Sequence, residues 1–142
     1  MAKERSNVVS ITRQSKPVDI TEPYDAEWLR GKTIIITGGA SGFGEAFFRK
    51  WAENGANVII GDINDTRGKA LVEEVRKQTG NPHLHYFHCD VTMWQSQVDL
   101  FHSALKVSPN GGIDHVVANA GVTDLHPTFE TPQNLDAEEP PK

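Results

Sequence analysis

A glycine-rich turn constrains the fold of this chain more than any other feature. Residues 32–37 form an apolar, β-branched run bounded by glycines, which predicts a buried strand. The next residues, 37–44, read Thr-Gly-Gly-Ala-Ser-Gly-Phe-Gly and lead directly into an amphipathic segment. A helix N-terminus binds anions through its backbone N–H groups and dipole, and the glycines at 38, 42 and 44 would let a pyrophosphate approach closely. The turn therefore predicts a nucleotide phosphate site.

The segment after the turn is predicted to be a helix. Phe43, Phe47 and Trp51 recur at a spacing of four, which places them on one helical face. Ser41 is a candidate N-cap, and the pair Asn54-Gly55 suits a helix C-terminus. We expect this helix to pack through its aromatic stripe.

Three further apolar runs predict strands, at residues 57–62, 83–89 and 113–118. Amphipathic segments separate them, so strands and helices alternate and each connection is long enough to cross over. This order predicts an α/β fold, a Rossmann-type doubly wound parallel sheet with right-handed crossover helices.

The two later helices have recognisable ends and apolar faces. The first is opened by Asp65 and closed by Gly80, and its inward face is predicted to hold Ala70, Leu71 and Val75. The second is predicted to be capped by Thr92, and its inward residues are predicted to be Val98, Phe101 and Leu105.

Composition excludes several classes of protein. The formal net charge of −5 argues against a protein that binds a nucleic-acid backbone, which needs a surplus of basic residues. No run reaches the roughly 18 apolar residues of a membrane-spanning helix. The single cysteine, Cys89, allows no internal disulfide and favours a reducing, cytoplasmic location.

The polar ends of the chain suggest three segments. Residues 1–27 are predicted to be a mobile N-terminal segment, 28–125 a partial dinucleotide-binding domain, and 126–142 an irregular tail rich in acidic residues and proline. The first sixteen residues carry four basic side chains, one acidic side chain and three serines, so a mitochondrial address is an open alternative.

Asp62 ends the second predicted strand, where a carboxylate can bind both ribose hydroxyls of an adenosine and repel a 2′-phosphate. NAD is therefore the predicted cofactor in preference to NADP. Arg67 could favour NADP, although its helical position predicts that it faces solvent. Asp62 could instead be a turn or capping residue, and methyltransferases that bind S-adenosylmethionine place an acid at the same strand end.

Four features in order resemble the short-chain dehydrogenases/reductases. They are the glycine turn at 37–44, Asp62, Cys-Asp-Val-Thr at 89–92, and Asn-Ala-Gly at 119–121. The resemblance covers residues 31–122 and implies the strand order 3-2-1-4. It also implies that Asp90 binds the adenine amino group, that Val91 packs on the ring, and that residues 119–121 stabilise the sheet beside the nicotinamide ribose.

The motifs and the resemblance together give a set of expected cofactor-binding residues. They are Thr37, Gly38, Ser41, Gly42, Phe43, Gly44, Asp62, Ile63, Asp90, Val91, Asn119, Ala120 and Gly121.

The family's catalytic Ser and its Tyr-x-x-x-Lys have no counterpart in this sequence. Tyr24 is followed four residues later by Trp28, and Tyr86 by Asp90. No catalytic residue is therefore assigned. We expect a truncated NAD(P)-dependent oxidoreductase, inactive alone, whose complete relatives act on secondary alcohols or ketones. The alternative is a non-catalytic dinucleotide-binding or protein-interaction module.

Two further expectations concern partners and metals. The strand at 113–118 would lie at an exposed, apolar sheet edge, through which the chain could form an oligomer. His83, His85 and His88 form a cluster, but strand alternation places His88 on the opposite face from the other two. No metal site is therefore predicted.

Overall fold

The structure is a computed structural model that describes residue 21 and residues 25–121. Most of the predicted N-terminal segment and all of the predicted 126–142 tail lie outside the described residues, as does Tyr24. The elements in chain order are η1 (Glu27–Leu29), β1 (Thr33–Thr37), α1 (Gly42–Glu53), β2 (Asn57–Asp62), α2 (Asp65–Thr79), β3 (Leu84–His88), α3 (Trp94–Val107) and β4 (His115–Val117).

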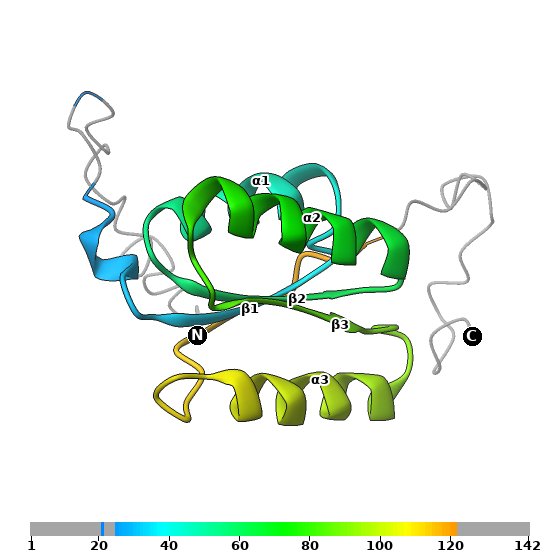
Figure 1. The fold of residues 1–142 in the computed structure, drawn as a ribbon. Helices are drawn as coiled ribbons and strands as arrows, with labels where there is room; N and C mark the ends of the chain where they lie inside the picture. Colours follow the sequence, from blue (N-terminus) through cyan, green and yellow to red (C-terminus); the bar gives the residue numbers. More distant parts are fainter. Residues whose placement is uncertain (1–20, 22–24, 122–142) are drawn as a thin grey trace, which may run out of the picture.

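The four strands form one parallel sheet in the order β3-β2-β1-β4, which confirms the predicted topology. Helices α1 and α2 cover one face of the sheet and α3 covers the other (Figure 1). Each helix therefore connects two parallel strands, as a crossover connection requires.

The core lies on both faces of the two central strands. Ile34 and Ile36 of β1 and Ile60 of β2 pack under α1 and α2, whereas Ile35 and Ile59 point to the α3 side. Side chains alternate along a strand, so a run that is apolar at every position buries both faces. This is why the apolar runs identified these strands in the sequence.

Helix α1 packs through a different face from the predicted one. Phe43 is 81% exposed and Phe47 is 44% exposed, whereas Phe48 is fully buried. Gly44 and Ala52 are buried on the same side as Phe48. The prediction is therefore wrong for Phe43 and Phe47, whereas Trp51 is partly buried and packs against the core. Phe47 and Trp51 stack on each other with ring centroids 5.4 Å apart.

Gly44 explains the orientation of α1. A Cβ atom on Gly44 would lie 2.2 Å from the carbonyl oxygen of Gly38, so this helical position must face the turn and the sheet. Residues four and eight positions later on a helix share its face, and these are Phe48 and Ala52. The glycine turn thus fixes which residues of α1 enter the core.

Helix α2 ends as predicted, but one inward residue is wrong. Gly80 closes it in the left-handed conformation with φ +70°, and Asn64 caps its start by accepting a hydrogen bond from the Arg67 N–H at 3.1 Å. The buried residues are Leu71, Val72 and Val75, together with Gly68, whereas Ala70 is exposed. Gly68 packs directly against the ring of Tyr86, which leaves no room there for a Cβ atom.

Helix α3 differs most from the prediction. It begins after Met93, not at Thr92, because Asp90 Oδ1 accepts hydrogen bonds from the Thr92 N–H at 2.9 Å and its hydroxyl at 2.7 Å. The buried residues are Leu100 and Ala104. The predicted inward residues are wrong: Val98 is half-buried, and Phe101 and Leu105 are exposed.

Close packing against the sheet sets the orientation of α3. A Cβ atom on Gly61 of β2 would lie 2.6 Å from the Leu100 side chain. Leu100 therefore occupies space that the glycine leaves open, and the apolar stripe of α3 turns away from the sheet. This contact links residues far apart in the sequence, so helical periodicity alone could not predict it.

Strand β4 is shorter than predicted and lies at an edge of the sheet. It pairs with β1 over three residues, and Val116 is 50% exposed. The ladder starts after Asp114, whose carboxylate accepts the Thr33 N–H at 2.8 Å, and it ends before Asn119 turns toward β1. Among the described residues no strand pairs with the outer side of β4, which agrees with the predicted exposed edge. Oligomerisation through this edge stays a prediction.

Candidate functional site

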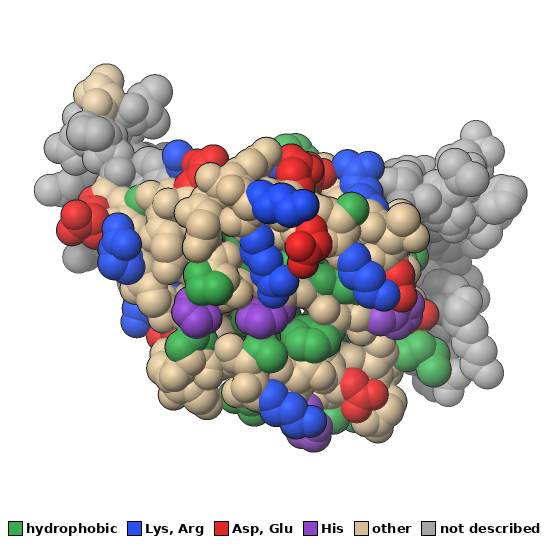
Figure 2. Space-filling view, viewed as in Figure 1, with side chains coloured by type: hydrophobic (Ala, Val, Ile, Leu, Met, Phe, Trp, Pro, Cys, Tyr) green, Lys and Arg blue, Asp and Glu red, His purple; other side chains and the backbone are tan. Residues whose placement is uncertain are grey.

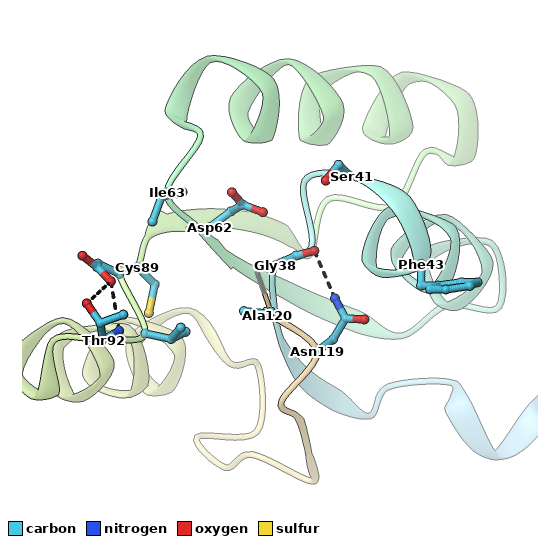
Figure 3. Close-up of a pocket in the computed structure, with 12 residues that line it drawn as sticks. Gly38, Ser41, Phe43, Asp62, Ile63, Cys89, Thr92, Asn119 and Ala120 are labelled. Atoms are coloured by element: carbon cyan, nitrogen blue, oxygen red, sulfur yellow. Dashed lines mark hydrogen bonds between the residues drawn. The ribbon is translucent and has the colours of Figure 1, made fainter. Parts of the chain in front are cut away.

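A pocket of about 440 Å³ lies at the carboxyl ends of the strands (Figure 3). The chain places β2 and β3 on one side of β1 and β4 on the other. The carboxyl ends of the strands at such a change of direction are the usual ligand site of open parallel sheets. Its lining residues are Gly38, Ser41, Phe43, Asp62, Ile63, Cys89, Asp90, Val91, Thr92, Asn119, Ala120 and Gly121.

The glycine turn forms one wall of the pocket. Gly38 has φ +65°, and a Cβ atom there would lie 2.7 Å from the Ala120 backbone. Gly42 has φ +56°, and a Cβ atom there would meet no atom within 4 Å. The first glycine thus permits close packing, whereas the second leaves open space at the N-terminus of α1. Such a cradle fits a pyrophosphate group.

Asn119 joins the end of β4 to the end of β1. Its side-chain amide donates hydrogen bonds to the carbonyl oxygens of Thr37 at 3.0 Å and Gly38 at 3.1 Å, the second of which is drawn in Figure 3. The Ala120 N–H donates to Thr37 Oγ1 at 3.2 Å. These bonds fix the glycine turn to the opposite wall of the pocket and so keep its shape.

Asp62 holds two backbone segments at once. Its Oδ2 accepts the Ala40 N–H and its Oδ1 accepts the Asn64 N–H, both at 2.9 Å. A carboxylate has about four acceptor positions, so two positions are left for ligand hydroxyls. Asp62 therefore organises its turn and also lines the pocket, and its binding of ribose hydroxyls stays a prediction.

The third wall of the pocket comes from the segment after β3. The hydrogen bonds from Thr92 hold the pKa of Asp90 below its usual range, so this carboxylate is ionised at neutral pH. Burial raises the pKa of the neighbouring Cys89 thiol, which keeps the thiol protonated and poorly nucleophilic. Val91 offers a half-exposed apolar surface beside both residues.

The structure places most of the expected residues in this pocket. Ten of them line it; the exceptions are Thr37, Gly42 and Gly44. Thr37 and Gly44 support the wall from behind, and Gly42 lies between the lining residues Ser41 and Phe43. Ser41 is the N-cap of α1 by position, but its side chain makes no capping hydrogen bond. The expected set omitted Cys89 and Thr92, which flank Asp90 and Val91 in the 89–92 motif.

Comparison with known proteins identifies the family to which the sheet order and the pocket motifs point. Residues 32–138 match the family model described as short chain dehydrogenase. The chain belongs to the short-chain dehydrogenase family. Its sheet order and the motifs around the pocket are those implied by the resemblance.

Two curated relatives and one solved structure show how much of the family this chain represents. The 5'-hydroxyaverantin dehydrogenase stcG of Emericella nidulans is 46% identical over 107 residues, which are 75% of this chain and 32% of the relative. Secoisolariciresinol dehydrogenase of Forsythia intermedia is 37% identical over 99 residues, 70% of this chain and 34% of the relative. The chain thus spans about a third of these relatives.

The solved structure is a 3-ketoacyl-(acyl-carrier-protein) reductase from Brucella melitensis complexed with NADH. It superposes with a TM-score of 0.60 at 29% identity, covering 66% of this chain and 36% of that one. The family match and this NADH complex support a nicotinamide dinucleotide as the cofactor.

Tyr86 is held in a hydrogen-bond network beside the end of β2. Its hydroxyl lies 2.7 Å from the Asp62 carbonyl oxygen and 2.8 Å from Asp65 Oδ1, and burial raises its pKa. Asp65 also contacts His88 Nδ1 at 2.8 Å, and this contact is the main reason that its pKa falls to about 2. The network fixes the segment that follows Asp62.

Two classes of feature are absent from the described part of the chain. Residues 25–121 contain no group of three or more His, Cys, Asp or Glu side chains arranged to hold a metal ion. Within the same residues, no helix combines the length and apolar character needed to cross a bilayer.

Proposed function

We propose that this chain is the cofactor-binding part of an NAD-dependent oxidoreductase. The observation that carries the proposal is that one pocket is lined by two carboxylates, Asp62 and Asp90, and by Ser41 and Phe43, the residues on either side of the open Gly42 position. A bound nicotinamide would accept or donate the hydride in the interconversion of a secondary alcohol and a ketone. Residues 28–125 would form the binding unit.

Backbone groups at the start of α1 would hold the pyrophosphate. Gly42 leaves the space, and the N–H groups and dipole of the helix supply the positive potential. The described pocket lining contains no Lys or Arg, so the backbone has to meet the negative charge of the phosphates. Asn119 would keep this cradle rigid through its bonds to residues 37 and 38.

The adenosine half would lie between the ends of β2 and β3. Asp62 would accept the ribose hydroxyls, Ile63 and Val91 would flank the adenine ring, and Asp90 would accept its amino group. Residues 119–121 would border the nicotinamide ribose. A 2′-phosphate would face two carboxylates, so NAD is the preferred cofactor.

The chain supplies binding and orientation in this scheme, and no proton transfer to substrate. The sequence has no tyrosine followed by lysine four residues later, and the hydroxyl of Tyr86 is engaged with Asp62 and Asp65. We therefore expect no turnover by this chain alone. The same observation, together with the exposed edge of β4, supports a second candidate function, a non-catalytic dinucleotide-binding module that pairs with another chain.

Replacing Asp62 with Asn tests the ribose assignment. Hydrogen bonds to a charged group contribute about 1.5–3 kcal/mol, so we expect NAD affinity to fall about tenfold or more. NADP affinity should fall less, because the substitution also removes the repulsion of the 2′-phosphate. Calorimetric titration with both dinucleotides measures the ratio of the two affinities.

Asp114→Asn is the matched control. Asp114 also accepts a backbone N–H, that of Thr33 at 2.8 Å, but at the amino end of β1. It should leave the ratio of NAD to NADP affinity unchanged. An unchanged ratio in the Asp62→Asn variant would contradict the role of Asp62 at the ribose.

A further inference from the structure

Arg67 is a cation beside the pocket that the proposed cofactor contacts do not use. Its Nε donates to the Ala40 carbonyl oxygen at 2.6 Å, and its Nη2 contacts Glu45 Oε2 at 2.9 Å. Ala40 uses its N–H to bind Asp62. Ala40 of the glycine turn is therefore hydrogen-bonded both to Arg67 and to Asp62, the carboxylate proposed to bind the ribose. The Arg67 side chain is 55% exposed, as predicted, and it makes these bonds in addition.

Glu45 holds Arg67 within a chain of alternating charges between α1 and α2. Its Oε1 contacts Arg49 at 2.9 Å, and Arg49 in turn contacts Glu74 at 2.9 Å. The hydrogen bond from Arg67 is the main reason that the pKa of Glu45 is lowered, so Glu45 is ionised at neutral pH. Figure 2 shows positive and negative side chains interspersed over the helices of this face.

A 2′-phosphate at the ribose would need a positive partner in this site. Its charge is about −1.5 to −2 at neutral pH, as for other phosphomonoesters. The pocket lining contains Asp62 and Asp90 but no Lys or Arg, and Arg67 is the one described Lys or Arg side chain hydrogen-bonded to the glycine turn. Its guanidinium pairs with Glu45 through Nη2, so the carboxylate of Glu45 offsets the positive charge that a 2′-phosphate would need.

We infer that Glu45 is a specificity-determining residue that disfavours NADP by engaging Arg67. The inference rests on the proposed function and extends it. Asp62 repels the 2′-phosphate directly, whereas Glu45 pairs with the cation that could compensate and offsets its charge. Glu45 acts through Arg67, so it is a positioning residue.

Glu45→Gln removes the negative charge and keeps the shape of the side chain. We expect the affinity for NADP relative to NAD to rise about three- to tenfold, because Arg67 becomes available to the 2′-phosphate. The gain should disappear in the double variant Glu45→Gln/Arg67→Gln. Titration of each folded variant with NAD and NADP gives the ratios, and Glu45→Ala repeats the test if the Gln variant does not fold.

Glu74→Gln is the matched control, because Glu74 pairs with Arg49 at the same 2.9 Å but makes no contact with Arg67. It should leave the ratio unchanged. An unchanged ratio in Glu45→Gln, a gain that persists in the double variant, or an equal gain in Glu74→Gln would each overturn the inference. If the unsubstituted chain binds neither dinucleotide, the proposed function fails, and the inference fails with it.

Discussion

Substitution of Gly42 by alanine is expected to weaken NAD binding at least tenfold. The added Cβ atom would project into the open space at the N-terminus of α1, where the pyrophosphate is proposed to lie. The residue has φ +56°, so alanine would also bring backbone strain of about 1–2 kcal/mol. Calorimetric titration measures the change in affinity, and urea denaturation measures the change in stability.

Gly80→Ala separates the two effects of that substitution. Gly80 has φ +70°, and a Cβ atom there would also meet nothing within 4 Å, but it closes α2 away from the pocket lining. We expect a similar loss of stability with unchanged NAD affinity. Wild-type affinity in Gly42→Ala would contradict the phosphate assignment, and so would an equal loss of affinity in both variants.

Phe48→Ala is expected to cause the largest loss of stability. Phe48 is fully buried between α1 and the sheet, and removal of such a side chain costs about 3–5 kcal/mol. If the unsubstituted chain has low stability, the same loss will leave the variant unfolded, and it will show no cooperative unfolding transition. Urea denaturation followed by circular dichroism measures the effect.

Phe47→Ala is the control for Phe48 and tests the orientation of α1. Phe47 is the neighbouring residue of the same type and is 44% exposed, so its replacement should cost less than about 1 kcal/mol. Equal losses, or a larger loss for Phe47, would show that the aromatic stripe faces the core after all.

Sequence periodicity was sufficient for the strands but not for the faces of the helices. In β1 and β2 nearly every residue is buried, so an apolar run identifies the strand without further information. The orientation of each helix depends on one close contact outside the helix: Gly44 on Gly38 of the preceding turn, and Gly68 on Tyr86 and Leu100 on Gly61, which are distant in the sequence. Phe43 and Phe47 remained on the exposed face of α1, although they share the helical spacing of Trp51, because these contacts decide the packing.

The sequence likewise predicted one part of the site and not another. The motif positions predicted most of the pocket lining, because the carboxyl ends of parallel strands meet at one edge of the sheet. The hydrogen bonds that organise the site could not be predicted. Asp62 binds Ala40, and Arg67 binds Ala40 and Glu45, across separations that only the folded backbone closes.

The most direct test of this account is calorimetric titration of the folded, monodisperse 142-residue chain with NAD. We expect saturable binding at one site per chain, with NADP binding more weakly. The same titration of Gly42→Ala should show the loss described above. No measurable binding of NAD by a chain that shows cooperative unfolding would contradict the assignment of the pocket as a dinucleotide site.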